Sequence, residues 1–523
     1  MALTKSIAEI ISEDTSGLLG IHPTWSRVRL AEIASVLNGF PFESVFFTGT
    51  TGIPLIRIRN ISEGKTQTRY NGPYENRFIV NTGDLLIGMD GDFHATCWKG
   101  EQALLNQRVC KITPNENFYH PKLIEYALPG YLNAINAATS SITVKHLSSK
   151  SIEEIDLPLP PIGEQTRIAG KLEELLSDLD AGVAELKAAQ RKLVRYRQSL
   201  LKAAVEGTLT ADWRAARAQT GEPQETGAEL LQRILSERRA RWEAKQLAKF
   251  AKQGKNPPKG WQDKYPAPVL PKAVGLHALP VGWAWASLDM IGEIASGVAK
   301  GTKRSSATIT REVPYLRVAN VQRGYLDLTQ IKTIAATEAD IEELRLQPGD
   351  VLFNEGGDLD KLGRGWVWQG ELKECIHQNH VFRVRPYLSG TPSELISHHG
   401  NTFGKDWFKT AGKQTTNLAS INMKMLREFP IPVAAELEGR KILEILSPML
   451  DILAAQEKSI ELGLKQAAAQ RKNILKAAFT GQLVSQDPND EPASVLLERI
   501  RAARVAAGAK RTGKTARKTK ECT

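Results

Sequence analysis

Residues 172–207 read LEELLSDLDAGVAELKAAQRKLVRYRQSLLKAAVEG, and residues 446–481 read LSPMLDILAAQEKSIELGLKQAAAQRKNILKAAFTG. Leucine recurs at every seventh residue of the first stretch, and Leu, Ile or Ala stands at the matching positions of the second. So narrow an apolar stripe requires a partner helix, because it cannot face a broad core. The pattern predicts a coiled-coil seam made of Leu172, Leu179, Leu186, Leu193, Leu200, Leu446, Leu453, Ile460, Ala467 and Ile474.

Both stretches have clear helix boundaries. Each follows a proline cluster, at 157–161 or 430–432, and each ends at a glycine, Gly207 or Gly481. Proline prevents the helix from extending backward, and glycine accepts the left-handed conformation of a C-cap. Pro448 should kink the second helix or delay its regular part. Roughly 40 residues of helix extend about 60 Å, so two antiparallel helices would set the separation of the segments that they connect.

The segments outside the helices also repeat. Trp25-Ser-Arg-Val-Arg-Leu aligns with Trp285-Ala-Ser-Leu-Asp-Met, and Leu157-Pro-Leu-Pro aligns with Phe429-Pro-Ile-Pro. Between them, Gly83-Asp84 matches Gly349-Asp350. A repeat of this length has the size of a domain with its connector, which indicates a duplicated module.

The sequence therefore predicts an α+β protein: two β-rich globular domains in tandem repeat, separated by two long antiparallel helices that form a coiled coil. Short apolar runs between Gly, Asn and Pro turns indicate the strands. The expected segments are an N-terminal segment (1–19), the first globular domain (20–158), the first helix (159–207), a basic helical linker (208–280), the second globular domain (281–430), the second helix (431–483) and a basic C-terminal tail (484–523).

The positive charge is concentrated in the linker and the tail. The formal net charge is +11, but residues 499–523 alone carry nine Lys/Arg and one acid, and residues 238–264 carry nine and two. These segments contribute +8 and +7, which leaves −4 for the rest of the chain. Charge alone therefore supports nucleic-acid binding only weakly. The start of the sequence has no apolar run with a cleavage site, and no stretch is long and apolar enough to span a membrane, so we expect the cytoplasm.

No string of residues makes a convincing active site. Gly508-Ala-Lys-Arg-Thr-Gly-Lys-Thr515 fits the phosphate-loop pattern, but no apolar strand precedes it. Asn256-Pro-Pro-Lys259 has lysine where amino-methyltransferases have an aromatic residue. Cys375, His377 and His380 could ligate a metal, although core or surface roles are more common for such residues. We expect no catalytic, cofactor-binding or metal-binding residue in this chain.

Candidate DNA contacts fall in two groups. Arg57, Arg59 and Asn60 lie in a run that Arg317 and Asn320 match in the repeat, where structural roles are at least as plausible. Loops that differ between the two halves are better placed to read different sequences, although ordinary solvated turns would account for about half of their residues. These loops contribute His94, Lys99, Lys145, His146, Lys361, Arg364, Lys413, Gln414 and Asn417.

Several motifs together resemble the specificity subunit of type I restriction–modification systems. They are Leu157-Pro-Leu-Pro-Pro-Ile-Gly-Glu164-Gln165, Arg197-Gln-Ser-Leu-Leu-Lys-Ala-Ala-Val-Glu-Gly207, Asn256-Pro-Pro-Lys-Gly-Trp261, Leu279-Pro-Val-Gly-Trp283 and Ile474-Leu-Lys-Ala-Ala-Phe-Thr-Gly481. The resemblance covers nearly the whole chain. One departure is Val433-Ala-Ala-Glu436, which lacks the second proline and the Glu-Gln pair of the first copy.

The resemblance implies that the globular domains are target recognition domains, each reading half of a split double-stranded DNA site. It also implies docking of two methyltransferase subunits and of restriction/translocase subunits, with S-adenosylmethionine, ATP and magnesium bound by those partners. The alternatives are a coiled-coil scaffold without DNA readout and a single-chain methyltransferase or nuclease. The roles of the basic linker and tail stay open.

Overall fold

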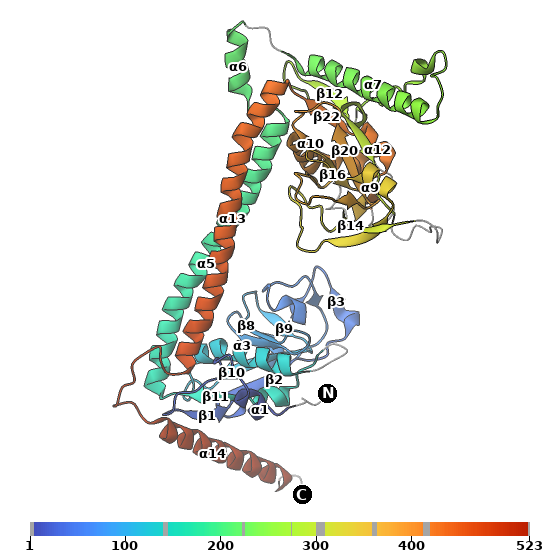
Figure 1. Cartoon of the computed structure of the whole chain (residues 1–523). Coiled ribbons are helices and arrows are strands. Elements are labelled where there is room, and N and C mark those ends of the chain that lie inside the picture. The colour runs from blue at the N-terminus through green and yellow to red at the C-terminus, as the bar shows by residue number, and fades with distance from the viewer. Residues whose placement is uncertain are drawn as a thin grey trace. The chain divides into compact units, whose positions relative to one another are not determined.

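The computed structural model describes residues 5–139, 145–221, 225–273, 275–299, 309–357, 363–411 and 419–520 (Figure 1). The chain divides into two compact units: residues 1–188 with 460–523, and residues 189–459. Each unit contains one β-rich region, part of each of the two long helices and a shorter helix that packs on the β-rich region. We call residues 26–159 the first head and residues 284–433 the second head.

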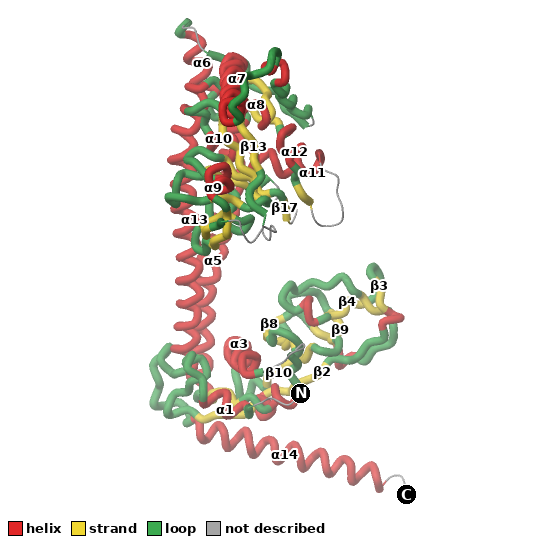
Figure 2. The backbone as a smooth tube through the Cα atoms, turned by 45° about the vertical axis from the view of Figure 1, so that its right-hand side comes forward, coloured by secondary structure: helices red, strands yellow, loops and turns green. Residues whose placement is uncertain are grey.

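The described residues of the first head form three sheets. Its two ends meet where β1 (Ser26–Arg29) pairs antiparallel with β11 (Asp156–Leu159). A four-stranded sheet has the order β2 (Ala34–Asn38), β10 (Val109–Pro114), β7 (Leu85–Gly88), β8 (His94–Cys97). A five-stranded sheet has the order β3 (Phe47–Thr48), β5 (Arg69–Tyr70), β4 (Ile53–Ile56), β9 (Ala103–Leu105), β6 (Ile79–Val80). The helices of this head are α2 (Leu30–Ile33), α3 (Pro121–Ala138) and α4 (Ser149–Glu153). Figure 2 shows α3 beside β8, which it contacts.

The second head repeats this plan. Its ends meet where β12 (Ala284–Ser287) pairs antiparallel with β22 (Pro430–Val433). Its four-stranded sheet has the order β13 (Gly292–Ala295), β20 (Val381–Pro386), β16 (Val351–Asn354), β18 (Gly365–Val367). Two smaller sheets join β15 (Lys332–Ala336), β14 (Arg311–Leu316) and β19 (Ile376–His377), and β17 (Gly356–Gly357) with β21 (Ala419–Ser420). The helices are α8 (Leu288–Ile291), α9 (Glu338–Leu344), α10 (Ser393–His399), α11 (Lys405–Ala411) and α12 (Met423–Glu428).

The Gly-Asp turn before β7 and β16 shows how closely the heads match. In the first head the Gly83 N–H donates to the Trp98 carbonyl, and the Trp98 N–H donates to the Asp84 carbonyl, both at 2.8 Å. In the second head Gly349, Trp368 and Asp350 form the same two bonds at the same lengths. Both tryptophans are buried. They are core residues that hold the turn in place. Neither Trp98 nor Trp368 is therefore exposed for contact with a ligand.

The strand pairing shows which residues of the two heads are equivalent. At both ends of the heads this equivalence differs by two residues from the alignment made from the sequence. Since β1 starts directly after Trp25 and β12 directly after Trp283, Trp283 and not Trp285 corresponds to Trp25. At the other end, Leu159 pairs with Ser26 as Val433 pairs with Ala284. The alignment of Leu157-Pro with Phe429-Pro was therefore wrong by two residues.

The two long helices are α5 (Ile162–Val205) and α13 (Glu436–Phe479). The glycines after them, Gly207 and Gly481, have φ of 72° and 70°, the left-handed conformation expected of a C-cap. The helix α13 starts upstream of Pro448 and continues through it, so the proline does not delay the helix.

The helices pack antiparallel in each unit. In the first unit Asp180 pairs with Arg471 at 2.6 Å, and in the second unit Arg197 pairs with Glu457 at 2.9 Å. Within the first unit a Cβ at Gly463 would lie 3.3 Å from the Leu186 side chain, and within the second unit Thr210, just after α5, donates to Glu438. In each unit, residue numbers thus rise along α5 as those of the partner residues fall along α13, as the heptads predict for an antiparallel coiled coil. The seam residues Leu172, Leu200, Leu446, Leu453 and Ile474 are buried, and Leu179, Leu186, Leu193, Ile460 and Ala467 are half-buried.

The linker and the tail contribute equivalent helices. In the second unit Leu230, Leu231 and Ile234 of α7 (Gly227–Lys252) join the core of the second head, where Figure 1 shows α7 along β12 and β22. In the first unit Leu496 and Ile500 of α14 (Ala493–Lys520) join the core of the first head.

The ion pairs of these helices match as well. Arg233 pairs with Glu225 near α7, and Arg499 pairs with Glu491 near α14. Each head is therefore completed by a helix outside its own residue range: α7 shortly precedes the second head in the sequence, whereas α14 lies at the opposite end of the chain from the first head. The remaining described helices include α1 (Ile7–Ser12) and α6 (Ala211–Gln219). Among the helices of the described residues, none is long and apolar enough to cross a membrane.

Candidate nucleic-acid interface

A connected group of charged side chains lies at one end of the four-stranded sheet of the first head. Asp90 follows β7, Arg108 precedes β10, and His146 lies shortly before α4. His146 Nδ1 lies 2.6 Å from Asp90 Oδ1, and Arg108 Nε lies 3.6 Å from Asp90 Oδ2. The Arg108 side chain is 53% exposed. Arginine and histidine in such a position can donate to phosphates or to the edges of bases.

The backbone of this surface is held in an uncommon conformation. Arg108 has φ of 73°, and no other non-glycine residue of the described ranges has a positive φ. The Arg108 carbonyl accepts from the Met89 N–H at 3.0 Å, and the Met89 carbonyl accepts from the Leu147 N–H at 2.7 Å. Three separate segments are thereby fixed side by side. Left-handed backbone at a bulky residue costs energy and is found at functional sites.

The second head places different residues at the matching position. His380 precedes β20 as Arg108 precedes β10, and Glu355 follows β16. His380 Nδ1 contacts Glu355 Oε2, and the Glu355 N–H donates to the His380 carbonyl at 2.9 Å. Both heads thus pair an acidic loop residue with a basic residue at the start of the central strand. The change from arginine to histidine alters the hydrogen bonds that each head can offer.

A surface hollow in the first head collects other predicted contacts. Arg59 and Asn60 of a 3₁₀ turn, η2 (Ile58–Asn60), line it together with Lys99, which follows β8. Lys65 also lines it and is exposed, although nothing in the sequence marked its turn. Thr48, Thr66, Gln67, Glu63 and Glu101 complete a polar rim. The hollow offers basic and amide groups beside Pro54 and Trp98, and such groups can meet a phosphate backbone or base edges.

Two further predicted residues lie close to this turn. Arg57, just before η2, is exposed. His94 is half-buried, and its Nε2 lies 3.0 Å from Ser62 Oγ. The absent side chain of Gly88 leaves room here, because a Cβ would lie 3.1 Å from Ile58 and 3.4 Å from His94. The structure therefore brings η2 and His94 together on one face.

The asparagines of the repeated run have a structural role in both heads. Asn60 Oδ1 accepts from the Arg57 N–H at 3.1 Å, and Asn320 Oδ1 accepts from the Arg317 N–H at 3.0 Å. Asn320 is buried and also donates to the Asp327 and Gln330 carbonyls. The Asn320 amide thus donates and accepts inside the second head, where the side chain is 3% exposed.

Other predicted residues also bond within their heads. Lys145 Nζ donates to the carbonyl and the side chain of Asn136, near the end of α3. Arg317 donates to the Gln330 carbonyl at 3.1 Å. Arg364 donates to Gln322 Oε1 and to the Val318 carbonyl. These cations hold loops together, which sequence reasoning could not distinguish from a free cation. Lys361, Lys413, Gln414 and Asn417 lie outside the described residues.

Each long helix has one buried glutamate near its start, Glu164 in α5 and Glu438 in α13. The sequence alone did not identify Glu438. In the first unit Trp25 Nε1 donates to Glu164 Oε2 at 2.9 Å. In the second unit Trp283 Nε1 donates to Glu438 Oε2 at 2.9 Å. Glu438 therefore takes the place of Glu164, while Gly439 stands where Gln165 does, so the second copy lacks the Glu-Gln pair as expected but keeps its glutamate. The two-residue error in the repeat alignment had hidden it.

The two glutamates differ in what surrounds them. Glu438 Oε1 accepts from Thr210 Oγ1 at 2.7 Å and from Arg214 Nη1 at 2.5 Å. Glu164 Oε1 is buried without a hydrogen-bond partner. Burial raises the pKa of the Glu164 carboxyl, and the bond from Trp25 opposes that shift only in part.

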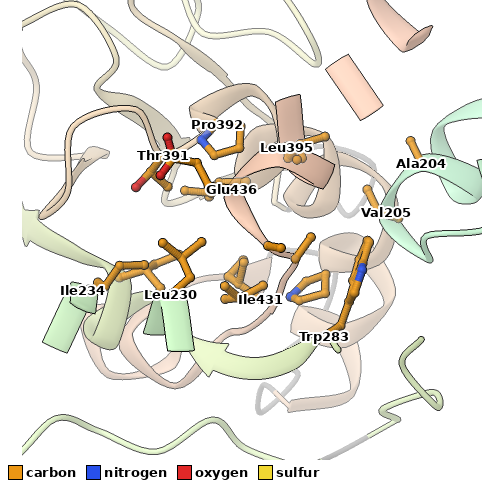
Figure 3. A pocket seen from close by; sticks show the side chains of 17 residues that line it. Ala204, Val205, Leu230, Ile234, Trp283, Thr391, Pro392, Leu395, Ile431 and Glu436 are labelled. Carbon is orange, nitrogen blue, oxygen red and sulfur yellow. The ribbon is translucent and has the colours of Figure 1, made fainter. Parts of the chain in front are cut away.

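Two features of the described residues bear on cofactor and metal binding. They contain no group of three or more His, Cys, Asp or Glu side chains placed to hold a metal ion. Figure 3 shows an apolar cavity in the second unit, lined by Leu230, Trp283, Leu395 and Ile431 among others. Its volume is about 50 Å³, which suits a few water molecules, whereas ligand pockets usually measure ~300–1,000 Å³.

The strings that mimic catalytic motifs have other roles. The phosphate-loop pattern at 508–515 lies within helix α14 and forms no loop. Burial lowers the pKa of His377 to about 4, and its Nδ1 bonds to the Val381 carbonyl. Cys375 is also buried. Neither residue forms a site with His380, which pairs with Glu355 on the surface.

The sequence is similar to known proteins of one family. A family model described as "Type I restriction modification DNA specificity domain" matches residues 23–189. The type I restriction enzyme EcoBI specificity subunit of Escherichia coli is 31% identical over 533 residues, covering 98% of this chain and 99% of that protein. The EcoKI specificity subunit of Escherichia coli (strain K12) is 23% identical, covering 94% and 97%.

A solved structure shares the fold. A chain described under "Structural basis underlying complex assembly and conformational transition of the type I R-M system" matches with a TM-score of 0.54 and 17% identity, covering 88% of this chain and 99% of that one. Two equivalent β-rich heads, two long helices that pack together and a full-length match at 31% identity all point the same way. The chain belongs to the type I restriction enzyme specificity subunits, the non-catalytic component of type I restriction–modification complexes.

Proposed function

We propose that this subunit reads a bipartite DNA site, one half with each head. The observation that carries the proposal is the equivalence of the heads combined with the difference between their polar loops. The four-stranded sheets, the strand pairs that join the ends of each head and the Gly-Asp turns match between the heads. Arg108 with Asp90 and His146 stands in one head where His380 with Glu355 stands in the other. A common scaffold with different donors and acceptors suits two readers of different sequences.

In the first head the reading surface comprises the Asp90–Arg108–His146 group and the hollow lined by Arg59 and Lys99. Arg57 and Lys65 add exposed cations nearby in the chain. Cations on phosphates would set the position of the head, and arginine or amide groups on base edges would set its specificity. In the second head we assign the corresponding surface to the loops around Glu355 and His380.

The long helices are the docking surface for two methyltransferase subunits. Large apolar side chains remain exposed on them: in the second unit Tyr196 is 49% and Ile452 58% exposed, and in the first unit Leu462 is 56% exposed. Exposed apolar residues on paired helices favour a protein partner. Restriction/translocase subunits would join the same complex, and S-adenosylmethionine, ATP and magnesium would be bound by the partners. The helix length would set the gap between the two half-sites.

Mapping of methylated adenines in the host DNA tests the proposal. DNA from cells that carry the chain with its co-encoded partners should show methylation in a split motif. The motif should disappear when only this chain is removed. Methylation that persists without the chain, or a motif with a single uninterrupted element, would contradict bipartite reading.

A further inference from the structure

The second half of α7 and the segment after it form a compact hairpin whose two arms are held together by contacts between aromatic rings. We call residues 242–265 the basic hairpin; it ends in a 3₁₀ turn, η4 (Trp261–Lys264). The Trp242 and Trp261 rings stack with centroids 5.7 Å apart, and Phe250 meets Trp261 edge-on at 6.0 Å. Tyr265 meets Trp242 edge-on at 5.5 Å. These contacts give the hairpin a fixed shape.

One buried arginine anchors the hairpin to the second head. Arg238, whose side chain is 8% exposed, donates to Tyr265 Oη at 2.5 Å and to the Pro266 carbonyl at 2.9 Å. Its Nη2 donates to Asp289 Oδ2 at 3.0 Å, and its Nε donates to the Asp289 carbonyl at 3.2 Å. A buried arginine that donates to several partners positions them firmly. The hairpin is therefore a built part of the second unit.

The outside of the hairpin is strongly basic. Residues 245–264 contain six lysines and a single acid, Asp263, and all six lysines are exposed. Lys245 pairs with Glu293 at 3.3 Å. In the described part of the chain, no carboxylate lies within ion-pair distance of the other five, which are Lys249, Lys252, Lys255, Lys259 and Lys264.

This concentration of charge suits a phosphate backbone. Lys245, Lys249 and Lys252 lie on one helix face at spacings of four and three residues, so their ammonium groups repel one another. The stripe spans about 10 Å of helix at ~1.5 Å per residue, which is about three phosphates of one DNA strand at ~3.4 Å of axis per nucleotide. Apart from Leu247, the large apolar side chains of the hairpin pack on one another. The aromatic rings are half-buried, and the exposed surface of the hairpin holds six lysines against one large apolar side chain, Leu247. Such a surface suits a polyanion better than an apolar protein interface.

We infer that the basic hairpin binds the phosphate backbone of duplex DNA without reading its sequence, as a clamp beside the second head. The inference rests on the proposed function in that it takes DNA as the ligand of the subunit. Phosphate contacts add affinity and position but carry no sequence information. The clamp would therefore contribute affinity for any duplex, and the heads would supply the discrimination.

The test measures the salt dependence of DNA affinity in the assembled complex. The probe is a duplex of random sequence that lacks the mapped motif, titrated with potassium chloride and followed by fluorescence anisotropy. Replacing Lys249, Lys252, Lys255 and Lys259 by Gln should reduce the slope of log affinity against log salt by about 3 to 4, at ~0.9 per lost phosphate contact. The matched variant with Arg at the same four positions keeps the charge and should keep the slope.

Three outcomes would overturn the clamp. The slope of the Gln variant could equal that of the unchanged chain, which would make the lysines a solvated face. The Gln variant could keep the slope but lose a partner subunit, which would identify an acidic protein as the ligand. The methylated motif could change, which would mean that the lysines read bases. Failure of the proposed function is a separate result: no methylated motif would depend on the chain, whatever the slopes are.

Discussion

Glu164 and Glu438 occupy equivalent positions but have different hydrogen-bond partners. Glu438 accepts from Trp283, Thr210 and Arg214 through both oxygens, whereas Glu164 accepts from Trp25 and leaves Oε1 without a partner. Both side chains are buried. The same substitution should therefore have different consequences in the two units.

Replacement of Glu438 by Gln should lower the free energy of unfolding by about 2–3 kcal/mol, because an amide nitrogen would face a donor and Arg214 would lose its anion. Replacement of Glu164 by Gln should change it by less than about 1 kcal/mol, since the amide oxygen can still accept from Trp25. Urea unfolding at neutral pH, followed by tryptophan fluorescence, measures both. Equal losses for the two variants would contradict this account.

The Glu164 variant also has a defined pH dependence. Burial raises the pKa of Glu164 in the folded state, so the folded protein holds this proton more tightly than the unfolded chain. The contribution of Glu164 to stability is then complete below its ordinary pKa and is lost as the pH rises through the raised folded pKa. The stability of the Gln variant relative to the unchanged chain should therefore increase with pH over that range. A pH-independent difference would contradict the assignment.

At the residue scale the sequence predicted which residue types to consider but not which of them are available. Arg59 and Lys99 are exposed as a DNA contact requires, whereas Lys145 and Asn320 bond to backbone carbonyls of their own heads. Loops leave backbone groups unpaired, and polar side chains of the same types satisfy them. Only the fold determines which role a given side chain has.

At the scale of elements, the coiled-coil seam was predictable because a heptad repeat fixes both the helix and the face that it buries. The seam can be tested with neighbouring residues of α13. Leu453 is 3% exposed and packs with Leu200 and Leu446, whereas Ile452 is 58% exposed.

Leu453→Ala should lower the free energy of unfolding by about 2–4 kcal/mol, because it removes buried methyl groups and leaves a cavity. Ile452→Ala should change it by less than about 0.5 kcal/mol, since the side chain is mostly in water. Chemical denaturation of the two variants in parallel gives the comparison. A larger loss for Ile452→Ala than for Leu453→Ala would mean that the seam is wrongly assigned.

The strand register was not predictable, for a physical reason. Trp283-Ala-Trp285 offers two tryptophans two residues apart, and a shift of two residues keeps every side chain of a strand on the same face. Alternation of apolar residues therefore could not distinguish the two alignments. The pairing of β12 with β22 resolves the choice, because it places Trp283 beside Glu438 as Trp25 lies beside Glu164.

At the scale of the whole molecule, the folded units are not continuous segments of the sequence, because the first unit combines the two ends of the chain. The first unit joins residues 1–188 to residues 460–523, so the tail helix α14 completes the core of the first head through Leu496 and Ile500. The apolar spacing of these residues predicts a helix but does not identify its partner, because the contact joins the two ends of the sequence. The matching role of α7 in the second unit gives linker and tail a common structural explanation.

Affinity for DNA and sequence specificity are expected to come from different parts of the molecule. Most of the net positive charge lies in the linker and the tail, and the heads carry the residues that differ between the two halves. The linker and the tail would then supply most of the sequence-independent attraction to DNA, and the heads would discriminate between bases. The central claim is that each head reads its own half-site independently.

The most direct measurement of that claim is a map of methylated adenines after an exchange of heads. Residues 20–158 would be replaced by the corresponding residues of a relative with a different first head, with the rest of the chain and its partners kept. One half of the split motif should change while the other half and the gap stay the same. A change in both halves, or in neither, would contradict that claim.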